Sequence, residues 1–478
     1  MARDAYEAQT IWKDRDLKVQ GPPTTQPGLY SGVLYFYLLS LPYGIGGGDP
    51  RFAAVFMALL NSLTIIPIFF LAKDLFRSTL WATISATLFV FSFEATQYAL
   101  WLSNPSPAIL TISMFFLCLR IWQKGNKWGL PLSVLFASLS AQLEFFLIFL
   151  FVVILIFKYF FRIKFKLAEL ILSLVILLIV MSTFLVSMVK FNTFTQVIQG
   201  FLSVSQSGDI SFRIKFTDFL FIYINRFGDL FINNFFPLNV LVGGILGLSV
   251  LILLIKKSFF SKVQSNSEKN SYKFILFTLL CYIPIFLFGG QNASYTTVGM
   301  VVPAILGVSL LLQTIFKRDR KLTLILLSFI LLSNLYMIFK INPNGQVILV
   351  IPKEMLLKNQ LSLVDKTYQE AGGEQFSINT LTLPLWTNTT WAYLYSWYGL
   401  KKYGYLPYFY GRDQIGLLGA DDLKKISKLL PISFFIREPH IGIPENFYNE
   451  EISTEDSKTK LVESINFNGL TLEKRVPK

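Results

Sequence analysis

The chain has 478 residues, of which 53% are hydrophobic and only 15% are charged. A soluble globular chain carries about 25% charged residues, so this composition excludes an ordinary soluble enzyme and predicts a membrane protein. A net charge of +14 would suggest nucleic-acid binding in a soluble protein. Most of this charge lies in short runs between apolar stretches, so we expect membrane lipid and no nucleic acid as a partner.

The inventory of reactive side chains is small. Both cysteines, Cys118 and Cys281, lie inside apolar segments, and the single histidine, His440, lies in the polar C-terminal part. Zinc sites built from His and Cys, and catalysis by a histidine base, are therefore effectively excluded. Acid–base chemistry is expected to fall to carboxylates, and the sequence requires no divalent metal.

The chain begins with a polar, charged stretch, MARDAYEAQTIWKDRDLKVQ. The segment RDAYEAQTIWK is expected to form a helix, on which Arg3 and Glu7 share a face because they are four residues apart. On a solvated surface such a pair contributes little. Beside a membrane, Arg3, Asp4 and Glu7 become candidates for a functional site, because charges at a membrane edge are costly.

Residues 29–45, LYSGVLYFYLLSLPYGI, are apolar but short and aromatic. We predict a helix that lies in the outer membrane interface and ends at Pro42, with its aromatic side chains at headgroup depth: Tyr30, Tyr35, Phe36 and Tyr37. The alternative is a true span, which would invert every later loop. The distribution of Lys and Arg argues against that alternative.

Membrane spans need roughly 17 to 25 apolar residues, and shorter helices can share a crossing. We expect ten spans, near residues 52–72, 79–98, 106–122, 129–142, 144–161, 167–189, 237–255, 274–289, 296–316 and 322–339. Two short helices are expected to meet at a polar hinge, SAQLEFF. The predicted fold is an all-α polytopic bundle over residues 51–339, preceded by an outer loop and interfacial helix over residues 1–50.

The loops predict an orientation. Alternate connections carry KDLFR, QKGNKW, KYFFRIKFK, KKSFFSKVQSNSEKNSYK and KRDRK, whereas the intervening ones, LWLSNPS, AQLE and GGQNASYT, carry no Lys or Arg. Basic loops stay cytoplasmic, so residues 1–50, the loop 190–236 and the tail from 340 are expected outside. Residues 1–28 hold neither a signal sequence nor a span, and we therefore expect a further helix upstream in the natural protein.

Two outer segments are long enough to fold. The loop 190–236 is rich in Phe and Leu and predicts amphipathic helices on the membrane face. From residue 340 the composition becomes soluble, with strands expected at 347–352, within EQFSINTLTL and within PISFFIRE, and a helix over 353–371. We predict a small extracytoplasmic α/β domain over residues 340–478, with the aromatic run from Trp386 to Tyr410 in its core.

Two further carboxylates lie on the outer side of the predicted bundle. Glu94 lies within a span, where a buried carboxylate usually has structural hydrogen-bond partners, and we expect a structural role for it. Glu144 lies at the hinge between the two short spans.

About the first 150 residues also resemble a known family, and the remaining pattern of spans resembles it loosely. The segments RDAYEAQTIWKDRDL, GPPTTQPGLYSGVLYFYLLSLPYGIGGGDPRFAAVFMALLNSLTIIPIFFLAKDLF and YALWLSNPSP resemble the protein O-mannosyltransferase and aminoarabinose transferase branch of the GT-C glycosyltransferases. They are most similar to bacterial dolichyl-phosphate-mannose-protein mannosyltransferase-like members, of glycosyltransferase family 39 type. The resemblance implies that a sugar is transferred, with inversion, from a polyprenyl-phosphate carrier to an acceptor on the outer face of the cell membrane.

The resemblance also implies roles for individual residues. Asp4 matches the first-loop acid and would be the catalytic base, with Arg3 as a phosphate or orienting partner. The other implied substrate- or carrier-binding residues are Tyr6, Glu7, Trp101, Asn104, Gln142, Glu144 and Tyr295.

Two departures from the family pattern concern the carrier phosphate. Ser294 stands where relatives have a cation, and a Glu at position 144 would repel a phosphate unless it is protonated or paired. The basic residues that would compensate are Arg213, Lys215 and Arg226 of the large outer loop, and the sequence does not choose among them.

Two alternatives from other functional classes stay open. One is a transporter or flippase of lipid-linked glycans, which would carry broken helices and charges near the midplane. The other is a non-catalytic membrane scaffold whose outer domain binds a partner. The donor sugar, the acceptor and the oligomeric state cannot be read from the sequence, because one apolar cavity with a lone carboxylate serves many substrates.

Overall fold

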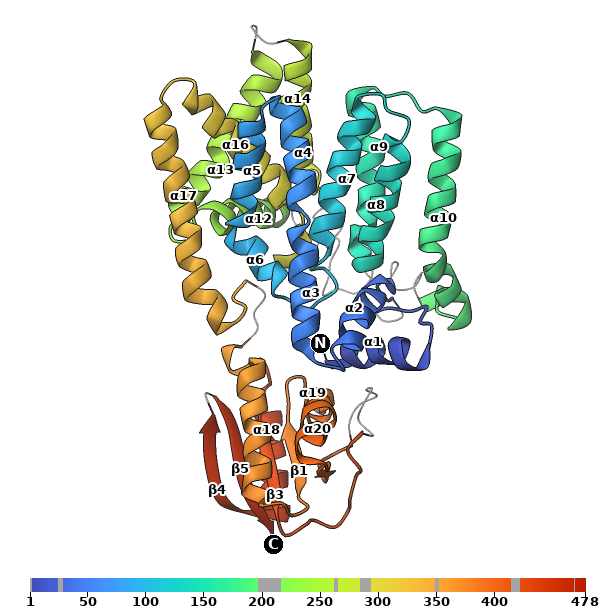
Figure 1. The fold of residues 1–478 in the computed structure, drawn as a ribbon, viewed down its shortest axis with the longest axis vertical. Coiled ribbons are helices and arrows are strands. Elements are labelled where there is room, and N and C mark those ends of the chain that lie inside the picture. Colours follow the sequence, from blue (N-terminus) through green and yellow to red (C-terminus); the bar gives the residue numbers. More distant parts are fainter. Residues whose placement is uncertain are drawn as a thin grey trace. The chain divides into compact units, whose positions relative to one another are not determined.

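A computed structural model describes residues 2–24, 29–196, 216–261, 265–283, 294–348, 352–413, 422–467 and 469–478 (Figure 1). The chain forms two compact units. Unit 1 combines Met1–Asp16, Leu39–Phe52 and Asn344–Lys478, and unit 2 combines Leu17–Leu38 and Ala53–Pro343. Unit 1 therefore joins the two ends of the sequence, while unit 2 holds the apolar middle.

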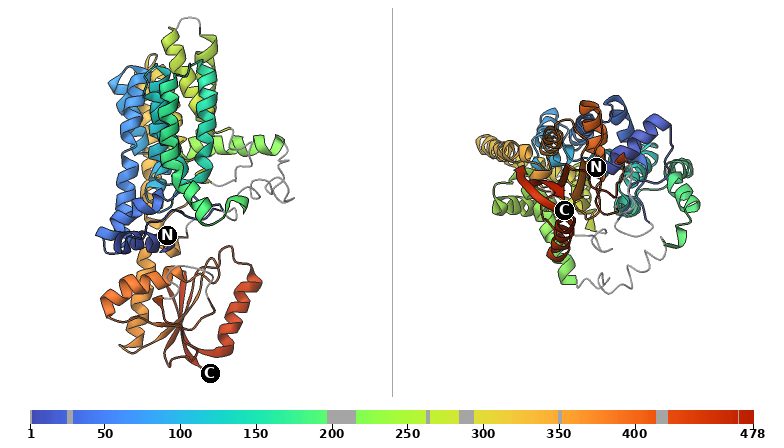
Figure 2. Two further views of the ribbon diagram at one scale, coloured as in Figure 1. Left: turned by 90° about the vertical axis from the view of Figure 1, so that its right-hand side faces the viewer. Right: turned by 90° about the horizontal axis from the view of Figure 1, so that it is seen from below.

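Unit 2 is a bundle of helices. After α2 (Leu34–Ile45) and α3 (Pro50–Ser62), which cross the boundary between the units, its helices are α4 (Ile65–Phe76), α5 (Thr79–Val90), α6 (Phe93–Ala99), α7 (Ala108–Gln123), α8 (Gly129–Leu143), α9 (Leu150–Phe161), α10 (Leu167–Lys190), α12 (Phe216–Phe235), α13 (Val240–Ile255), α14 (Asn266–Leu280), α16 (Val301–Phe316) and α17 (Arg320–Ile341). Most of them run side by side, whereas α12 lies crosswise to them (Figures 1 and 2).

Four helical stretches within the described ranges are long and apolar enough to cross a membrane: Pro50–Phe76, Leu167–Lys190, Val240–Phe260 and Arg320–Asn344. This finding supports a membrane protein, but it does not confirm ten spans. The expected span 79–98 is broken at Phe91, because the side chain of Ser92 accepts a hydrogen bond from the amide of Ala95 and starts a new helix, α6. The span 274–289 runs from α14 into residues outside the described ranges.

The expected hinge at SAQLEFF is confirmed. Helix α8 ends at Leu143, Glu144 has an extended backbone, and a short 3₁₀ helix over Phe145–Phe149 leads into α9. The Glu144 amide closes the last turn of α8 by donating to the carbonyl of Ser140 at 2.9 Å. The break therefore leaves a carboxylate between two short apolar helices.

The outer surface of unit 2 is strongly apolar. Long helices α10, α13 and α17 expose large side chains, including Ile179, Leu241 and Phe339. Polar groups lie inside instead, where the Ser85 hydroxyl donates to that of Ser309 at 2.8 Å and joins α5 to α16. Apolar side chains outside and interhelical hydrogen bonds inside are typical of helices surrounded by lipid.

The large outer loop contains a helix, as predicted. Helix α12 is amphipathic, burying Leu230, Phe231 and Phe235 while exposing Phe221 and Ile224. Arg213 and Lys215 lie outside the described residues. The interfacial segment 29–45 forms α2, but Tyr35 and Phe36 are buried in protein instead of lying free for lipid headgroups, and the helix continues through Pro42.

The C-terminal part of unit 1 is an α/β domain, as the composition indicated. Its elements are α18 (Leu357–Ala371), β1 (Ser377–Leu381), α19 (Thr389–Leu394), α20 (Leu400–Tyr403), β2 (Tyr408–Phe409), β3 (Ser433–Arg437), α21 (Glu445–Lys458), β4 (Thr459–Phe467) and β5 (Leu470–Pro477). The sheet order is β2-β1-β3-β5-β4. Strands β2, β1 and β3 are parallel, and β5 is antiparallel to β3 and β4.

The strand expected at 347–352 is wrong in its first part, because residues 347–348 lie in a turn, and residues 349–351 lie outside the described ranges. The expected helix begins later, at Leu357, after a 3₁₀ turn over Lys353–Met355. The hairpin of β4 and β5 was not predicted. Its signal is the Asn-Gly pair at 468–469, which is the commonest sequence of tight hairpin turns.

One face of the sheet carries the core of this domain. Alternate residues of β1, β3 and β5, such as Ile378, Phe434 and Leu472, pack with α18 and α19. Trp391 and Tyr395 lie in the same cluster, which confirms that the aromatic run contributes to the core. Helix α21 is bound to the other side, where further hydrogen bonds reach its Glu455 and Asp456 from Asn379, Tyr410 and Arg475.

A buried carboxyl group should make this domain sensitive to pH. Burial raises the pKa of Glu438 from an ordinary 4.5 to about 7, although the Leu383 amide and the Trp391 indole donate hydrogen bonds to it. The folded state then binds the proton more tightly than the unfolded chain, so the stabilisation is full below pH 4.5 and is lost as the pH rises through about 7.

We therefore expect the free energy of unfolding of the domain to fall by up to about 3 kcal/mol across this window. Glu438→Gln should remove that slope, which urea unfolding of the full chain in detergent at several pH values would measure. An identical slope in the variant would show that other groups cause the pH dependence.

Candidate functional site

The predicted N-terminal helix is present as α1 (Ala2–Asp14) in unit 1. Its buried residues are Asp4, Ala5, Ala8 and Ile11, which recur at the spacing of one helical face. This face packs on α19 of the same unit. The sequence therefore places a carboxylate on the face that α1 turns toward the domain.

Asp4 is the best-buried of the predicted site residues on α1, with 5% of its surface exposed. The Arg3 guanidinium donates to its Oδ1 through Nη2 at 2.6 Å and Nε at 3.0 Å. Burial by itself would raise the pKa of this carboxyl, but the positive charge of the amino terminus of this chain, and after it that of Arg3, lower the pKa below its usual value. The Asp4 carboxylate is therefore paired with the Arg3 guanidinium, which compensates its charge.

Tyrosines surround this region of α1. The Tyr6 hydroxyl donates to Oδ2 of Asp422 at 2.6 Å, and its ring meets Tyr393 edge-on at 5.1 Å between centroids. Burial, followed by the charges of Tyr393 and Asp4, raises the pKa of the Tyr43 hydroxyl. Glu7 lies half-buried on the same helix. Tyr6, Tyr43 and Tyr393 therefore supply aromatic rings and hydroxyl groups to the part of unit 1 that contains Asp4.

The remaining predicted residues lie in unit 2, where the hinge carboxylate is bound by an amide. Asn104 donates through Nδ2 to Oε2 of Glu144 at 2.6 Å and to the Leu143 carbonyl at 2.9 Å. The Ser31 hydroxyl lies at 3.4 Å from the same nitrogen. Asn104 and Glu144 are both half-buried, so a polar pair faces an accessible edge of the bundle.

Aromatic rings lie beside this pair. Tyr295 is 6.3 Å from Trp101 and 6.0 Å from Phe146 between ring centroids. Burial first, and then the negative charge of Glu144, raises the pKa of the Tyr295 hydroxyl. Trp101, Phe146 and Tyr295 are only partly buried. Flat aromatic faces next to an amide and a carboxylate can bind a polar ring-shaped ligand such as a sugar.

Gln142 occupies a different environment. It is 3% exposed, and its amide donates to the Val180 carbonyl at 2.7 Å and to the Thr183 hydroxyl at 2.8 Å. Both acceptors lie on α10, so Gln142 joins α8 to α10. Gly32 packs directly on it, because a Cβ at that position would lie 2.1 Å from its Oε1. Gln142 therefore supports the hinge by joining α8 to α10.

The structure thus brings the predicted residues together in two sets. Arg3, Asp4, Tyr6 and Glu7 lie on α1 in unit 1, and Trp101, Asn104, Gln142, Glu144 and Tyr295 lie around the hinge in unit 2. Sequence reasoning missed the residues that complete these sets, namely Tyr43, Tyr393, Asp422, Ser31 and Phe146. Asp422 and Tyr393 are hundreds of positions from α1, and no local pattern indicates that they meet it.

Two other charged candidates have structural partners. Glu94 is buried and accepts a hydrogen bond from Asn234, whose own side chain also accepts from Ser92, in line with a structural role. Arg226 forms an ion pair with Asp229 at 3.5 Å on α12. Among the residues with described positions, no cluster of three His, Cys, Asp or Glu side chains could hold a metal ion.

Comparison with known proteins identifies no relative: no family model matches the chain, and no curated protein matches it. The resemblance to GT-C glycosyltransferases therefore stands on the N-terminal segments and the YALWLSNPSP motif alone.

Proposed function

We propose that this chain is a GT-C-type membrane glycosyltransferase, which transfers a sugar from a polyprenyl-phosphate carrier to an acceptor on the outer face of the cell membrane. The observation that carries the proposal is the buried Asp4 carboxylate, paired with Arg3 on a helix that precedes the apolar bundle in the sequence. A positioned carboxylate next to a membrane is the group that an inverting sugar transfer needs.

The chemistry depends on this group. The acceptor hydroxyl attacks the anomeric carbon, the bond from that carbon to the phosphate oxygen breaks, and polyprenyl phosphate leaves with the bonding electrons. Asp4 takes the hydroxyl proton as the new glycosidic bond forms and later releases it to water. The ion pair with Arg3 favours the carboxylate form of Asp4, which is the form that can accept this proton.

Arg3 has two functions in this scheme. In the resting protein its guanidinium compensates the Asp4 charge, and a third of its side chain is exposed. A guanidinium in that position can orient the carboxylate or stabilise the leaving phosphate by charge. Tyr6, which is anchored to Asp422, and Glu7 support the same face of α1.

We assign the second set of residues to the sugar and its carrier. Trp101 and Tyr295 supply aromatic faces, and the Asn104–Glu144 pair supplies hydrogen-bond donors and acceptors for hydroxyl groups. Gln142 fixes the hinge on which these groups lie.

The proposed topology has ten spans with both ends outside. It combines the four long apolar helices with the shorter ones and agrees with the alternation of Lys- and Arg-rich loops. It places unit 1, with Asp4 and the α/β domain, outside the cytoplasm. Labelling of single cysteines introduced into the α/β domain of intact cells would test this orientation, since labelling only after lysis would contradict it.

Sugar transfer itself can be tested in membranes. Membranes that contain the full chain, incubated with radiolabelled polyprenyl-phosphate sugars, are expected to convert the label into a product that membranes without the chain do not form. Each carrier-linked sugar is supplied separately, and the labelled acceptor is then identified. If no carrier-linked sugar yields a product while the protein is folded and inserted, the enzymatic proposal fails.

One observation favours a second function, the movement of lipid-linked glycans across the membrane. The break between α5 and α6 lies next to the buried Glu94, and broken helices with an internal charge are typical of transporters. A flippase would move a fluorescent polyprenyl-phosphate sugar across vesicles that contain the chain and would form no new glycosidic bond. The two assays therefore separate the two functions.

A further inference from the structure

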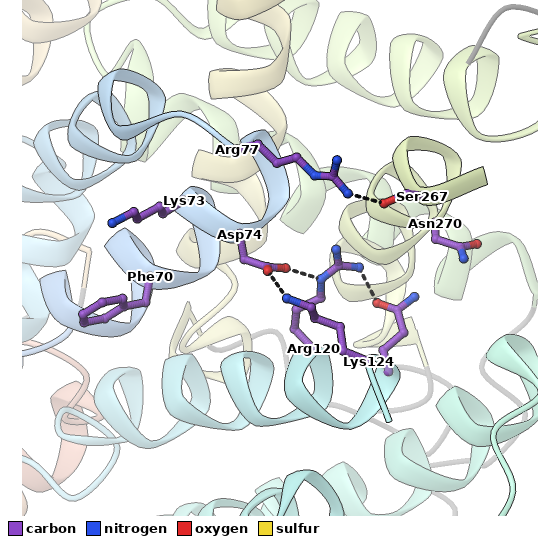
Figure 3. Close-up of a pocket in the computed structure, with 9 residues that line it drawn as sticks. Phe70, Lys73, Asp74, Arg77, Arg120, Lys124, Ser267 and Asn270 are labelled. Atoms are coloured by element: carbon purple, nitrogen blue, oxygen red, sulfur yellow. Dashed lines mark hydrogen bonds and ion pairs between the residues drawn. The ribbon is translucent and has the colours of Figure 1, made fainter. Parts of the chain in front are cut away.

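A basic cavity lies in unit 2, at helix ends that carry none of the candidate site residues. It has a volume of about 610 Å³ (Figure 3), and the residues that line it are Phe70, Lys73, Asp74, Arg77, Arg120, Gln123, Lys124, Ser267 and Asn270. They come from the C-terminal ends of α4 and α7, the residue Arg77 after α4, and the first turns of α14. We call this cavity the basic pocket.

The basic pocket lies far from the hinge. Helix α7 begins at Ala108, close to Asn104, and ends at Gln123 in the pocket. Sixteen residues of α-helix separate these ends, which corresponds to about 24 Å at 1.5 Å per residue. The pocket is therefore a separate feature, and a ligand bound there would not require the proposed sugar transfer.

Part of the charge in the pocket is already neutralised. Arg120 is 7% exposed, and its guanidinium donates to Asp74 at 2.7 Å, to Gln123 at 2.6 Å and to Ser271 at 3.1 Å. Lys124 forms an ion pair with the other oxygen of Asp74. Figure 3 shows Arg120 and Lys124 converging on Asp74, which fixes the floor of the pocket.

The remaining cations have no carboxylate of their own. In the described part of the chain Lys73 and Arg77 form no ion pair, and Arg77 donates a hydrogen bond to the neutral hydroxyl of Ser267 at 2.8 Å. Both side chains are exposed. The pocket therefore holds four basic side chains and one carboxylate, and has a clear excess of positive charge.

A further donor lacks an acceptor. The Nε2 group of Gln123 is buried and forms no hydrogen bond with the described residues. A buried amide donor without a partner is costly, and an acceptor-rich anion would satisfy it. Phosphate oxygens are commonly bound by the ammonium group of Lys, the guanidinium of Arg and neutral N–H donors.

We propose that the basic pocket binds a phosphate group, with Arg77 and Gln123 as donors and Lys73 as a further positive charge at the edge of the pocket. The phosphate can belong to an anionic phospholipid or to a soluble ion, since both present the same oxygens. The lipid source fits the surroundings, because the exposed Phe70 lies at one side of the pocket and α4 belongs to the candidate span Pro50–Phe76. Basic pockets between helix ends at headgroup depth are a known arrangement for acidic lipids.

The test uses the full chain in neutral detergent and two probes. Phosphatidylglycerol is titrated against phosphatidylcholine, and inorganic phosphate is titrated against chloride at equal ionic strength. Binding is followed by the midpoint of thermal unfolding and by native mass spectrometry. We expect phosphatidylglycerol to bind and to raise the midpoint, and phosphatidylcholine to have no effect.

The pocket variant is Lys73→Gln with Arg77→Gln, which leaves the ion pairs of Asp74 intact and changes exposed side chains only. Its affinity for phosphatidylglycerol should fall by about tenfold or more, because two positive charges of the pocket are removed. The matched control is Lys127→Gln with Lys164→Gln, two exposed lysines that do not line the pocket, and it should bind as the unchanged protein does. Lys73→Gln alone gives a second variant if the double change lowers the unfolding midpoint without ligand.

The outcomes separate the sources. Binding of phosphatidylglycerol without inorganic phosphate identifies a lipid headgroup, and comparable binding of inorganic phosphate identifies a soluble phosphate; either supports the proposal if the pocket variant weakens it. Binding of neither probe overturns the proposal. Equal loss in the pocket and control variants overturns it as well, since the attraction would then be that of the general positive charge.

Discussion

Replacing Asp4 by Asn is expected to lower the rate of sugar transfer by about 10² to 10⁴-fold, the range by which a general base accelerates a reaction. Asn keeps the size of Asp and can still accept a hydrogen bond from Arg3, so the fold of α1 should persist. The measurement is the initial rate of label transfer in membranes, with the amount of inserted protein determined in the same preparation.

The control for this variant is Asp14→Asn, the same chemical change on an exposed residue of the same helix. It should leave the rate unchanged. Unfolding midpoints in detergent should agree for both variants and the unchanged chain. A rate for Asp4→Asn equal to that of Asp14→Asn, at equal stability, would remove Asp4 from the mechanism and leave the hinge carboxylate as the candidate base.

Replacing Trp391 by Ala is expected to destabilise the α/β domain by about 3 to 5 kcal/mol, the usual cost of removing a large buried aromatic side chain. Trp391 is fully buried among the core residues of α18, β1 and β3. Its indole nitrogen also donates to Glu438 at 2.9 Å, so the change removes one of the partners of a buried carboxyl group. Proteolysis of the domain in urea, measured on the full chain, reports the free energy of unfolding.

Two companion variants separate the causes. Trp391→Phe keeps most of the ring volume and loses the hydrogen bond, so its loss of stability should be clearly smaller than that of Trp391→Ala. Phe447→Ala changes an aromatic residue on α21 that is 42% exposed, and it should shift the free energy by less than about 0.5 kcal/mol. A similar loss for Trp391→Ala and Phe447→Ala would show that Trp391 is not a core residue.

Local sequence was sufficient where a feature depends on neighbouring residues. Helix α1 was expected over RDAYEAQTIWK, where Arg3 and Glu7 share a face, and the hinge was expected at a Glu between two apolar runs. The parallel strands β1 and β3 are predicted by apolar runs bounded by polar residues. The α21 helix and strand β4 were missed because they are polar and largely exposed, and give no apolar periodicity of the kind expected for a core element. Strand β5 was missed although its Leu470 and Leu472 lie in the core.

The length of an apolar segment did not predict whether it forms one continuous helix or two shorter ones. The stretch 79–98 has the composition of one span, yet Ser92 caps a new helix and binds Asn234 of α12 at 2.5 Å, which draws the chain into a break. The number of apolar residues in a segment cannot predict such a hydrogen bond, because the partner lies far away in the sequence. The same reason explains why the packing of Gln142 against α10 was not predicted.

By itself, the sequence determined the class of the molecule. Few charges and long apolar runs indicate a membrane protein, and the polar C-terminal part indicates an α/β domain. It also named Asp4 and Glu144 as carboxylates at positions where charge is costly. Only the tertiary structure decided their partners. Arg3 is adjacent to Asp4, but Asp422 and Tyr393 reach α1, and Asn104 reaches Glu144, across long stretches of chain. Such contacts depend on how whole elements pack, and packing is a property of the folded chain that no local pattern of residues encodes.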